Sequence, residues 1–173
     1  MKRLSTYLKD NESSLISLNE RLVVNKNYKQ VYTCAPKSWK ELREIIDDRY
    51  NKLGAGTEEN PINFNDIDVS NINDNLSRLF YATIFKYINI SDWKFSKVKN
   101  ISYMFFYCAH LKSVGDLSDW DVSNVKYMNA MFYGCEELQS VGNLSNWDVS
   151  KVESMHEMFD KSGITNIPSW YKE

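Results

Sequence analysis

Cysteine and histidine are the residues of this sequence with the broadest chemistry, and both are few. The cysteines are Cys34, Cys108 and Cys135, and the last two lie 27 residues apart. A disulfide or a metal site joining that pair is one interpretation, although no CxxC pair or HxxxH cluster accompanies it. The other interpretation is a small apolar core position with free thiols, which a reducing compartment favours. Because His110 and His156 have no carboxylate partner at a fixed spacing, we expect no metal site and no catalytic histidine.

Acidic residues recur beside the tryptophans, in the pairs Asp66/Asp68 and Asp119/Asp121 and at Asp148. Such carboxylates could bind calcium or act as the two acids of a hydrolase. A calcium loop gathers several oxygen ligands around a turn glycine, which these segments lack, so a turn-capping role is favoured. No GxSxG motif or glycine-rich phosphate loop is present. The sequence therefore predicts a protein that is not an enzyme and holds no cofactor.

The composition argues against several classes of protein. The 173 residues are 43% hydrophobic and 14% aromatic, which is enough apolar surface for a folded core. The net charge of -2 offers no general attraction for phosphate backbones, so we expect no nucleic-acid partner. The longest apolar run is far shorter than the roughly 20 residues that cross a bilayer, and no secretion signal is recognisable. We expect no membrane insertion and a cytoplasmic location.

An internal repeat of 27 residues dominates the second half of the chain. The units Gly115 to Val141 and Gly142 to Pro168 are nearly superimposable, and another runs from Ile88 to Val114. A degenerate unit begins near Ile62, and in it Leu79-Phe80 replaces a Met-Phe pair. We interpret the matched apolar positions as structural ladders, in which identical side chains of successive units stack. These positions are Trp93, Trp120 and Trp147, Met104, Met131 and Met158, Phe105, Phe132 and Phe159, and Cys108 and Cys135.

The periodicity within each unit predicts its secondary structure. Trp120 and Val122 alternate as in a strand, whereas the Met and Phe positions after them have the i, i+3, i+4 spacing of one helical turn. Repeats of this length are typical of solenoids, whose units bury their apolar faces by stacking on neighbours. We therefore predict an α+β solenoid over residues 61–173, in which each unit is a strand, a short helix and an extended return.

Residues 1–60 lack the repeat and are predicted to form an N-terminal arm and a capping subdomain. Ser38-Trp39-Lys40-Glu41 is a capping box, followed by apolar residues on one helical face and then by Gly54, which predicts a helix over residues 38–53. Residues 22–24 and 30–33 favour a β-hairpin. A repeat array needs an atypical end to cover its first core layer, and this helix and hairpin are the candidates.

The string DLSDWDVSNVKYMNAMFYGCEELQSV resembles the repeat of the BspA-type leucine-rich repeat proteins, including the domain of unknown function that recurs in mycoplasma surface lipoproteins. The likeness covers residues 62–168, and Ser162 and Thr165 depart from it in the last unit. It implies that the α+β solenoid is leucine-rich-repeat-like. Members of that family are mostly secreted or lipid-anchored adhesins and interaction proteins, so the resemblance also implies a protein partner and no catalytic residues in the repeat.

The N-terminal segment MKRLSTYL, followed by ERLVVNKNYK, is similar to short leader-like segments on proteins of tailed phages that infect gut Bacteroidetes. This resemblance implies a phage-encoded protein whose arm is a docking or packaging tag. It adds virion association to the expected locations. It also makes a virion-associated structural protein, docked through that arm, the second hypothesis for function.

Positions that differ between units are the candidates for function, because stacking does not constrain them. Large aromatic residues at such positions anchor protein interfaces, since they bury much area with little loss of rotamer entropy. The predicted partner-binding residues are Tyr103, Phe106, Tyr107, Tyr127 and Tyr133. Burial of Phe106 and Tyr133 between turns is the competing interpretation. We expect a non-catalytic protein–protein interaction module with a repeat-ladder surface; a surface adhesin for host protein or glycan is the third hypothesis.

Overall fold

A computed structural model describes residues 32–172, which belong to one structural unit. The described residues form one α-helix, four strands of two or three residues and one 3-10 helix. In sequence order these are α3 (Trp39–Leu53), β1 (Ile62–Asn63), β2 (Asp74–Asn75), β3 (Ile88–Asn89), β4 (Val98–Asn100) and η1 (Leu144–Asn146). Most of the predicted hairpin and arm lies outside the described residues.

Helix α3 begins and ends where the capping signals of the sequence place it. The Ser38 hydroxyl accepts the Glu41 backbone N–H at 3.2 Å, and the Glu41 carboxylate accepts the Lys37 N–H at 2.8 Å. At the other end Gly54 adopts a positive φ of 75° and its N–H bonds the Tyr50 carbonyl. The helix contributes three buried side chains to the core: Leu42, Ile45 and Ile46.

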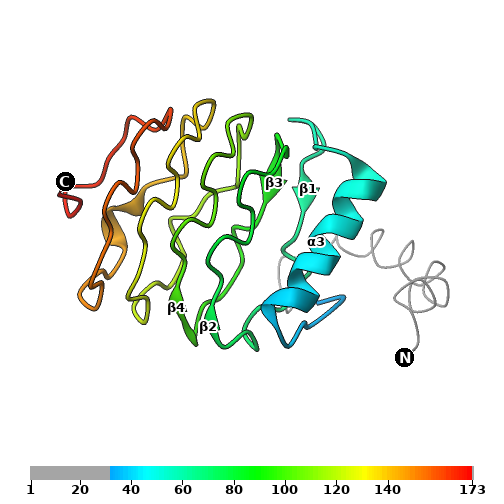
Figure 1. The fold of residues 1–173 in the computed structure, drawn as a ribbon, viewed down its shortest axis with the longest axis horizontal. Helices are drawn as coiled ribbons and strands as arrows, with labels where there is room; N and C mark the ends of the chain where they lie inside the picture. The colour runs from blue at the N-terminus through cyan, green and yellow to red at the C-terminus, as the bar shows by residue number, and fades with distance from the viewer. Residues whose placement is uncertain (1–31, 173) are drawn as a thin grey trace, which may run out of the picture. The chain divides into compact units, whose positions relative to one another are not determined.

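The strands pair in parallel between successive repeats. Ile62 of β1 lies opposite Ile88 of β3, and β2 pairs with β4 in the same sense. Isolated parallel bridges continue this pairing from Asn100 to Tyr127 and from Tyr127 to Ser154. Figure 1 shows the successive repeats lying side by side, beginning beside α3 and β1.

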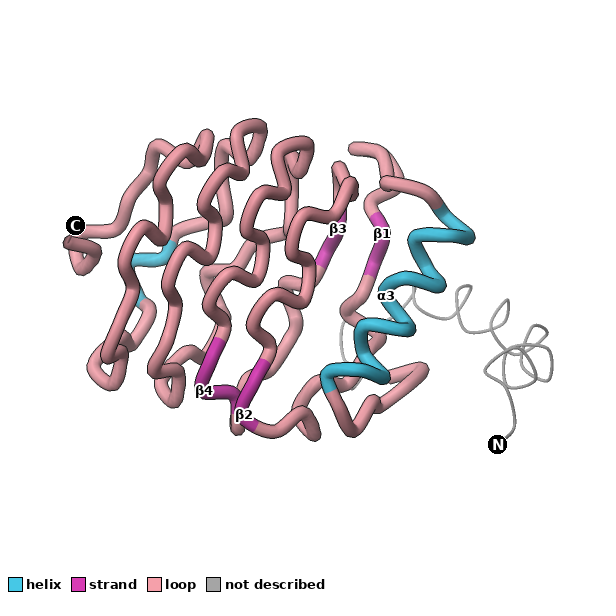
Figure 2. The backbone as a smooth tube through the Cα atoms, viewed as in Figure 1, coloured by secondary structure: helices cyan, strands magenta, loops and turns pink. Residues whose placement is uncertain are grey.

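The predicted fold class, a leucine-rich-repeat-like α+β solenoid of 27-residue units, is wrong. The described residues form a small mixed domain, with one helix and short strands in two two-stranded sheets. Figure 2 shows that loops and turns, rather than strands and helices, form most of the repeat backbone. In particular, the predicted short helix of each unit does not form within residues 61–172.

Left-handed residues explain why the Met-Phe segments are not helical. Each segment contains two residues with positive φ four positions apart, as at Ala130 (48°) and Gly134 (71°). A right-handed helix cannot continue through a left-handed residue. The i, i+3, i+4 spacing of apolar residues therefore comes from repeated tight turns. The other pairs are Arg78 and Ala82, Tyr103 and Tyr107, and Glu157 and Lys161.

Backbone hydrogen bonds join these segments into a ladder of four rows, which we define as residues 76–82, 101–107, 128–134 and 155–161. Alternate N–H groups of one row donate to carbonyls of the next row, as from Tyr103 to Asn129 at 2.8 Å. Rows 1, 2 and 3 each donate four such bonds, between 2.8 and 3.1 Å long: three to the next row and one to the residue just before it, which is Asn100, Tyr127 or Ser154. All these donors face the following row, so the ladder has a direction.

Aromatic side chains stack along the core of the ladder. Phe80, Phe105, Phe132 and Phe159 form a continuous stack with 5.3 to 5.8 Å between neighbouring ring centroids. Each core tryptophan bonds the preceding unit, as Trp120 Nε1 does by donating to the Ile90 carbonyl at 3.1 Å. All the residues proposed as structural ladders are buried: Trp93, Trp120, Trp147, Met104, Met131, Met158, Phe105, Phe132, Phe159, Cys108 and Cys135.

Polar side chains of α3 cover the carbonyl side of row 1. Trp39 Nε1 donates to the Ser77 carbonyl at 3.0 Å, and Arg43 Nη1 donates to the Leu79 carbonyl at 2.7 Å. These two carbonyls are equivalent to the ones that receive bonds from the preceding row elsewhere in the ladder. Helix α3 therefore supplies two of the four hydrogen bonds that a preceding row would make.

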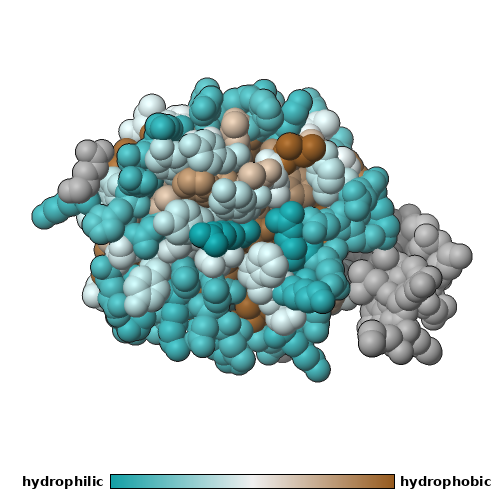
Figure 3. All heavy atoms as spheres, in the orientation of Figure 1, coloured by the Kyte–Doolittle hydropathy of each residue, from teal (hydrophilic) through white to brown (hydrophobic). Residues whose placement is uncertain are grey.

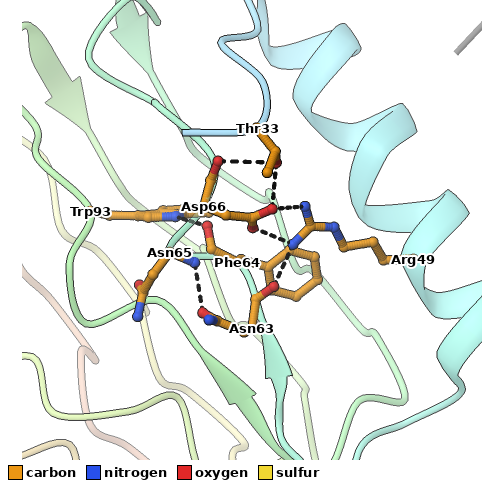
Figure 4. Close-up of polar contacts among 7 residues, drawn as sticks. All are labelled: Thr33, Arg49, Asn63, Phe64, Asn65, Asp66 and Trp93. Atoms are coloured by element: carbon orange, nitrogen blue, oxygen red, sulfur yellow. Dashed lines mark hydrogen bonds and ion pairs between the residues drawn. The ribbon is translucent and has the colours of Figure 1, made fainter. Parts of the chain in front are cut away.

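A partly buried ion pair also holds α3 to the first repeat. The Arg49 guanidinium donates to both carboxylate oxygens of Asp66, at 2.6 and 2.7 Å, and to the Asn63 carbonyl. Figure 4 shows this guanidinium facing Asp66, with Thr33 donating its hydroxyl to the same carboxylate. The Arg49 and Asp66 side chains are 19% and 28% exposed, so water screens the pair only in part.

Candidate protein-binding surface

Four of the five predicted partner-binding residues lie together on the outside of the ladder. Phe106 stacks on Tyr133 with 5.1 Å between ring centroids. Tyr103 and Tyr107 contact Phe106 edge-on at 5.3 and 4.6 Å. Tyr107 is 47% exposed, whereas Tyr103, Phe106 and Tyr133 are half-buried. Phe106 and Tyr133 are thus partly covered by neighbouring turns and still reach the surface.

The fifth predicted residue, Tyr127, lies in a different column, by which we mean a set of equivalent positions in successive repeat units. Its hydroxyl donates to Glu153 Oε2 at 2.6 Å, and its backbone bridges Asn100 and Ser154. That hydrogen bond raises the pKa of Tyr127, and the pKa of Glu153 is lowered by its hydrogen bonds from Lys126 and, to a smaller extent, from Tyr127. No ring contact within the described residues joins Tyr127 to the other four.

The structure adds a fifth ring that sequence reasoning missed. Tyr81 stacks on the other side of Phe106 at 5.4 Å and is 44% exposed. The signal was present, because matching Leu79-Phe80 to Met104-Phe105 places Tyr81 in the column of Phe106 at an offset of 25 rather than 27. We call the set Tyr81, Tyr103, Phe106, Tyr107 and Tyr133 the aromatic surface.

Two left-handed turns position the most exposed ring of the aromatic surface. Tyr107 has a φ of 56°, and its ring lies over Gly134, whose own φ is 71°. A Cβ atom at Gly134 would lie 2.9 Å from Tyr107 Cδ1. A side chain there would therefore displace the tyrosine, which explains why glycine occupies this position between Tyr107 and Lys161 in the column.

Cationic side chains flank the aromatic surface. The Arg78 guanidinium lies 5.3 Å from the Tyr103 ring centroid, and Lys161 Nζ lies 5.0 Å from that of Tyr133. The contact with Tyr133 raises the pKa of Lys161. Most of the surface visible in Figure 3 is hydrophilic, with hydrophobic side chains confined to small areas.

The acidic residues beside the tryptophans cap turns. Asp68, Asp121 and Asp148 each accept the backbone N–H of the serine two residues later, at 2.9 to 3.1 Å. The turn-capping interpretation is confirmed for these three residues, while Asp66 instead pairs with Arg49. Within residues 32–172 no group of three or more His, Cys, Asp or Glu side chains is arranged to hold a metal ion.

Asp116 caps a turn in the same way, by accepting the Ser118 N–H at 2.9 Å. Acid should destabilise the fold through three of these caps. Hydrogen bonds from the following serines, through the hydroxyl and then the backbone N–H, lower the pKa of Asp116, Asp121 and Asp148. A depressed pKa contributes stability above the carboxyl's ordinary value, about 4, and that stability is lost as the pH falls through the folded-state pKa.

The change Asp116→Asn/Asp121→Asn/Asp148→Asn should therefore flatten the fall of melting temperature on acidification below about pH 4. An asparagine oxygen can accept the same N–H, as Asn143 does from Ser145 at 3.0 Å. Thermal unfolding followed by circular dichroism at several pH values measures the slope. A slope equal to that of the unchanged chain would contradict the assignment.

The cysteines and histidines also have structural surroundings. Cys108 and Cys135 are buried free thiols that donate to the carbonyls of Phe80 and Phe105, at 2.9 and 3.0 Å. The hydrogen bond with Cys108, together with burial, raises the pKa of the Cys135 thiol. The expectation that His110 lacks a carboxylate partner is wrong, because its Nδ1 lies 3.0 Å from Glu137 Oε1, one repeat further along the chain.

The family of the chain follows from a comparison with family models. The model described as "Mycoplasma protein of unknown function, DUF285" matches residues 50–170, well over half of the chain. The chain belongs to this family. DUF285 is a repeat-type family related to the BspA-like proteins, and its match includes all four rows and the whole aromatic surface. No curated protein and no solved structure matches the chain.

The DUF285 region lacks a transmembrane helix as far as the structure describes it. None of the helices within residues 32–172 is both long and apolar enough to cross a bilayer.

Proposed function

We propose that this DUF285 chain is a non-catalytic protein-binding module that engages a partner protein through the aromatic surface. The observation that carries the proposal is the continuous stack of Tyr81, Phe106 and Tyr133 on the outside of three successive rows, with Tyr103 and Tyr107 packed against it. Tyrosine and phenylalanine are enriched where proteins bind one another, because they bury a large area at small entropic cost.

The backbone beneath the aromatic surface is suited to such a role. Its residues belong to rows that are hydrogen-bonded to each other at every second residue. The rings also restrain one another, and Arg78 and Lys161 cover two of them. A surface that is ordered before binding loses little conformational freedom when the partner docks, which favours affinity.

Ring orientation favours a protein partner over a glycan. Sugars stack on the exposed face of an aromatic ring, but Tyr81 and Tyr133 lie on the two faces of Phe106, at interplanar angles of 16° and 18°. Lys161 lies over the ring of Tyr133 as well. The faces of the Phe106 and Tyr133 rings are therefore largely engaged within the protein. Edges and hydroxyl groups, which suit backbone and side-chain contacts, remain for the partner.

The structural roles of the reactive side chains support a function without catalysis. The thiols of Cys108 and Cys135 are buried and bonded to carbonyls. Asp121 and Asp148 cap turns through the following serines.

The double change Phe106→Ala/Tyr133→Ala tests the proposal. Truncating two adjacent aromatic anchors should weaken partner binding roughly thirtyfold or more, as a loss of about 2 kcal/mol implies. The measurement is quantitative mass spectrometry of proteins captured on the immobilised chain from the producing cell, followed by titration of the captured partner.

The matched control is Tyr127→Ala, which removes a 38% exposed tyrosine outside the aromatic surface. It should leave capture unchanged. Melting curves establish that both variants are folded at the temperature of the experiment. Equal capture by the double variant and the unchanged chain would refute the proposed surface.

A further inference from the structure

Row 4 carries four backbone N–H groups of the kind that bind the next row elsewhere in the ladder. They belong to Met155, Glu157, Phe159 and Lys161. The equivalent groups of rows 1 to 3 all donate to carbonyls, at 2.8 to 3.1 Å. Within residues 32–172 no acceptor receives a hydrogen bond from these four groups. An edge of unpaired N–H groups is a template for another extended backbone.

The residues that follow row 4 cover the core and reach one backbone group of the row, but within residues 32–172 they accept none of these four N–H groups. Trp170 stacks on Trp147 and donates its Nε1–H to the Leu144 carbonyl, and Tyr171 packs edge-on against Phe159. The Tyr171 hydroxyl accepts the Met158 N–H at 3.2 Å. The apolar end is therefore closed by side chains, whereas the row of donors beside it is not occupied by a described carbonyl.

The two ends of the ladder differ in a way that disfavours a second copy of the chain at this edge. The matching carbonyls of row 1 at Ser77 and Leu79 already bind Trp39 and Arg43 of α3. Head-to-tail association would have to displace those bonds. Pairing of two row 4 edges would set N–H donors against N–H donors. An extended segment of a different protein, with free carbonyls, has neither obstacle.

An open pocket adjoins this edge of row 4. It measures about 400 Å³ and is lined by His156, Glu157, Asp160 and Tyr171. Two carboxylates line it, and Lys161, which is not among its lining residues, has its Nζ 5.0 Å from the Tyr133 ring centroid. A lysine or arginine side chain beside these carboxylates would form charge-assisted hydrogen bonds.

We propose that row 4 binds an extended, basic segment of a partner protein. The carbonyls of that segment accept hydrogen bonds from Met155, Glu157, Phe159 and Lys161, and a lysine or arginine of the segment lies against Glu157 and Asp160. This surface uses none of the five residues of the aromatic surface, although Lys161 of row 4 contacts the Tyr133 ring. Each can therefore be disabled without the other.

The repeat itself supplies a probe for the test. Residues 126–134, with sequence KYMNAMFYG, contain the carbonyls that accept the donors of row 2. A synthetic peptide of this sequence can present the same carbonyls to row 4, where the column of Ala130 continues through Glu157. Two versions are used, in which lysine or glutamate replaces that alanine, together with a scrambled lysine version of identical composition.

The main readout is amide hydrogen exchange and chemical shift by nuclear magnetic resonance on the full chain. In the free protein the four N–H groups of row 4 should exchange fast, and those of row 3 slowly. The lysine peptide should slow the row 4 groups at least tenfold. It should also bind roughly tenfold more tightly than the glutamate peptide.

Charge reversal makes the test independent of loss of folding. The change Glu157→Lys/Asp160→Lys should make the glutamate peptide the tighter ligand, a gain that unfolding cannot produce. Glu59→Lys, in an exposed loop, should leave the preference for the lysine peptide unchanged. Three results would each overturn the proposal: slow exchange of the row 4 groups in the free chain, equal binding of the scrambled peptide, or an unaltered preference after charge reversal.

Discussion

Replacing Trp120 with phenylalanine is expected to lower the free energy of unfolding by about 2–4 kcal/mol, one of the largest effects of a single change in this chain. The indole is 3% exposed and its Nε1–H donates to the Ile90 carbonyl of the preceding unit at 3.1 Å. Phenylalanine leaves that carbonyl without its bond and opens a cavity between Phe95 and Trp147, which both contact the indole. Denaturant unfolding followed by tryptophan fluorescence and circular dichroism measures the loss.

The chain offers a matched control for this substitution at its last tryptophan. Trp170 makes the equivalent bond, to the Leu144 carbonyl at 2.8 Å, but it is only half-buried. Trp170→Phe should therefore cost about 1 kcal/mol, because water can replace the lost donor. Equal costs for the two substitutions would show that burial between units does not determine the value of the indole bond.

Arg49→Ala should cost about 2–3 kcal/mol and loosen α3 from the first repeat. The change leaves the Asp66 carboxylate, which is 28% exposed, without its two guanidinium bonds, and frees the Asn63 carbonyl. It also removes the guanidinium from the face of Phe64, 5.3 Å away. Denaturant unfolding gives the cost. Amide exchange along α3 shows whether the helix separates before the ladder unfolds.

A second ion pair on the same helix is the control for Arg49. Lys52 and Asp48 are 2.8 Å apart, but their side chains are 52% and 40% exposed. Lys52→Ala should change stability by no more than about 0.5 kcal/mol. The cost of Arg49→Lys in stability should lie between those of Arg49→Ala and Lys52→Ala, since lysine keeps the charge and loses the bidentate geometry. If Arg49→Ala costs no more than Lys52→Ala, the ion pair does not anchor the helix.

The sequence predicted correctly the limits of α3 and the buried positions of the repeat. The capping box at Ser38 and the stop at Gly54 located α3, since such signals act within a few residues of the chain. The offset of 27 aligned the buried Trp, Met, Phe and Cys positions correctly, because stacked units repeat the same environment.

The predicted secondary structure of the repeat failed because apolar spacing does not reveal φ. Met128, Met131 and Phe132 fit one helical turn, yet Ala130 between them is left-handed. Alanine rarely adopts that conformation, and here its N–H bonds the His156 carbonyl of the next row at 2.8 Å. Apolar spacing within one unit contains no signal for this backbone conformation or for the contact between rows.

The residues of the aromatic surface were predicted only in part, because variation between units does not show which exposed positions lie next to one another. Phe106 and Tyr133 were found because their positions differ between units at a constant offset. Tyr127 also varies, but that column bonds Glu153 and lies apart from the other rings. Tyr81 was missed because the degenerate first unit shortens the offset to 25. Variability identifies outward positions, but it does not say which outward positions are neighbours.

The one-way direction of the backbone ladder has a consequence for how such proteins change in length. Every internal row receives hydrogen bonds from the row before it and gives them to the row after it. Duplication of one 27-residue unit in the gene would insert a row that forms the same hydrogen bonds with the row before it and the row after it. Neither the contacts of α3 at the start nor the donor edge at the end would need to alter. A gain or loss of one unit, for example by unequal recombination within the gene, would therefore change the number of rows and leave the contacts between the remaining rows as they are.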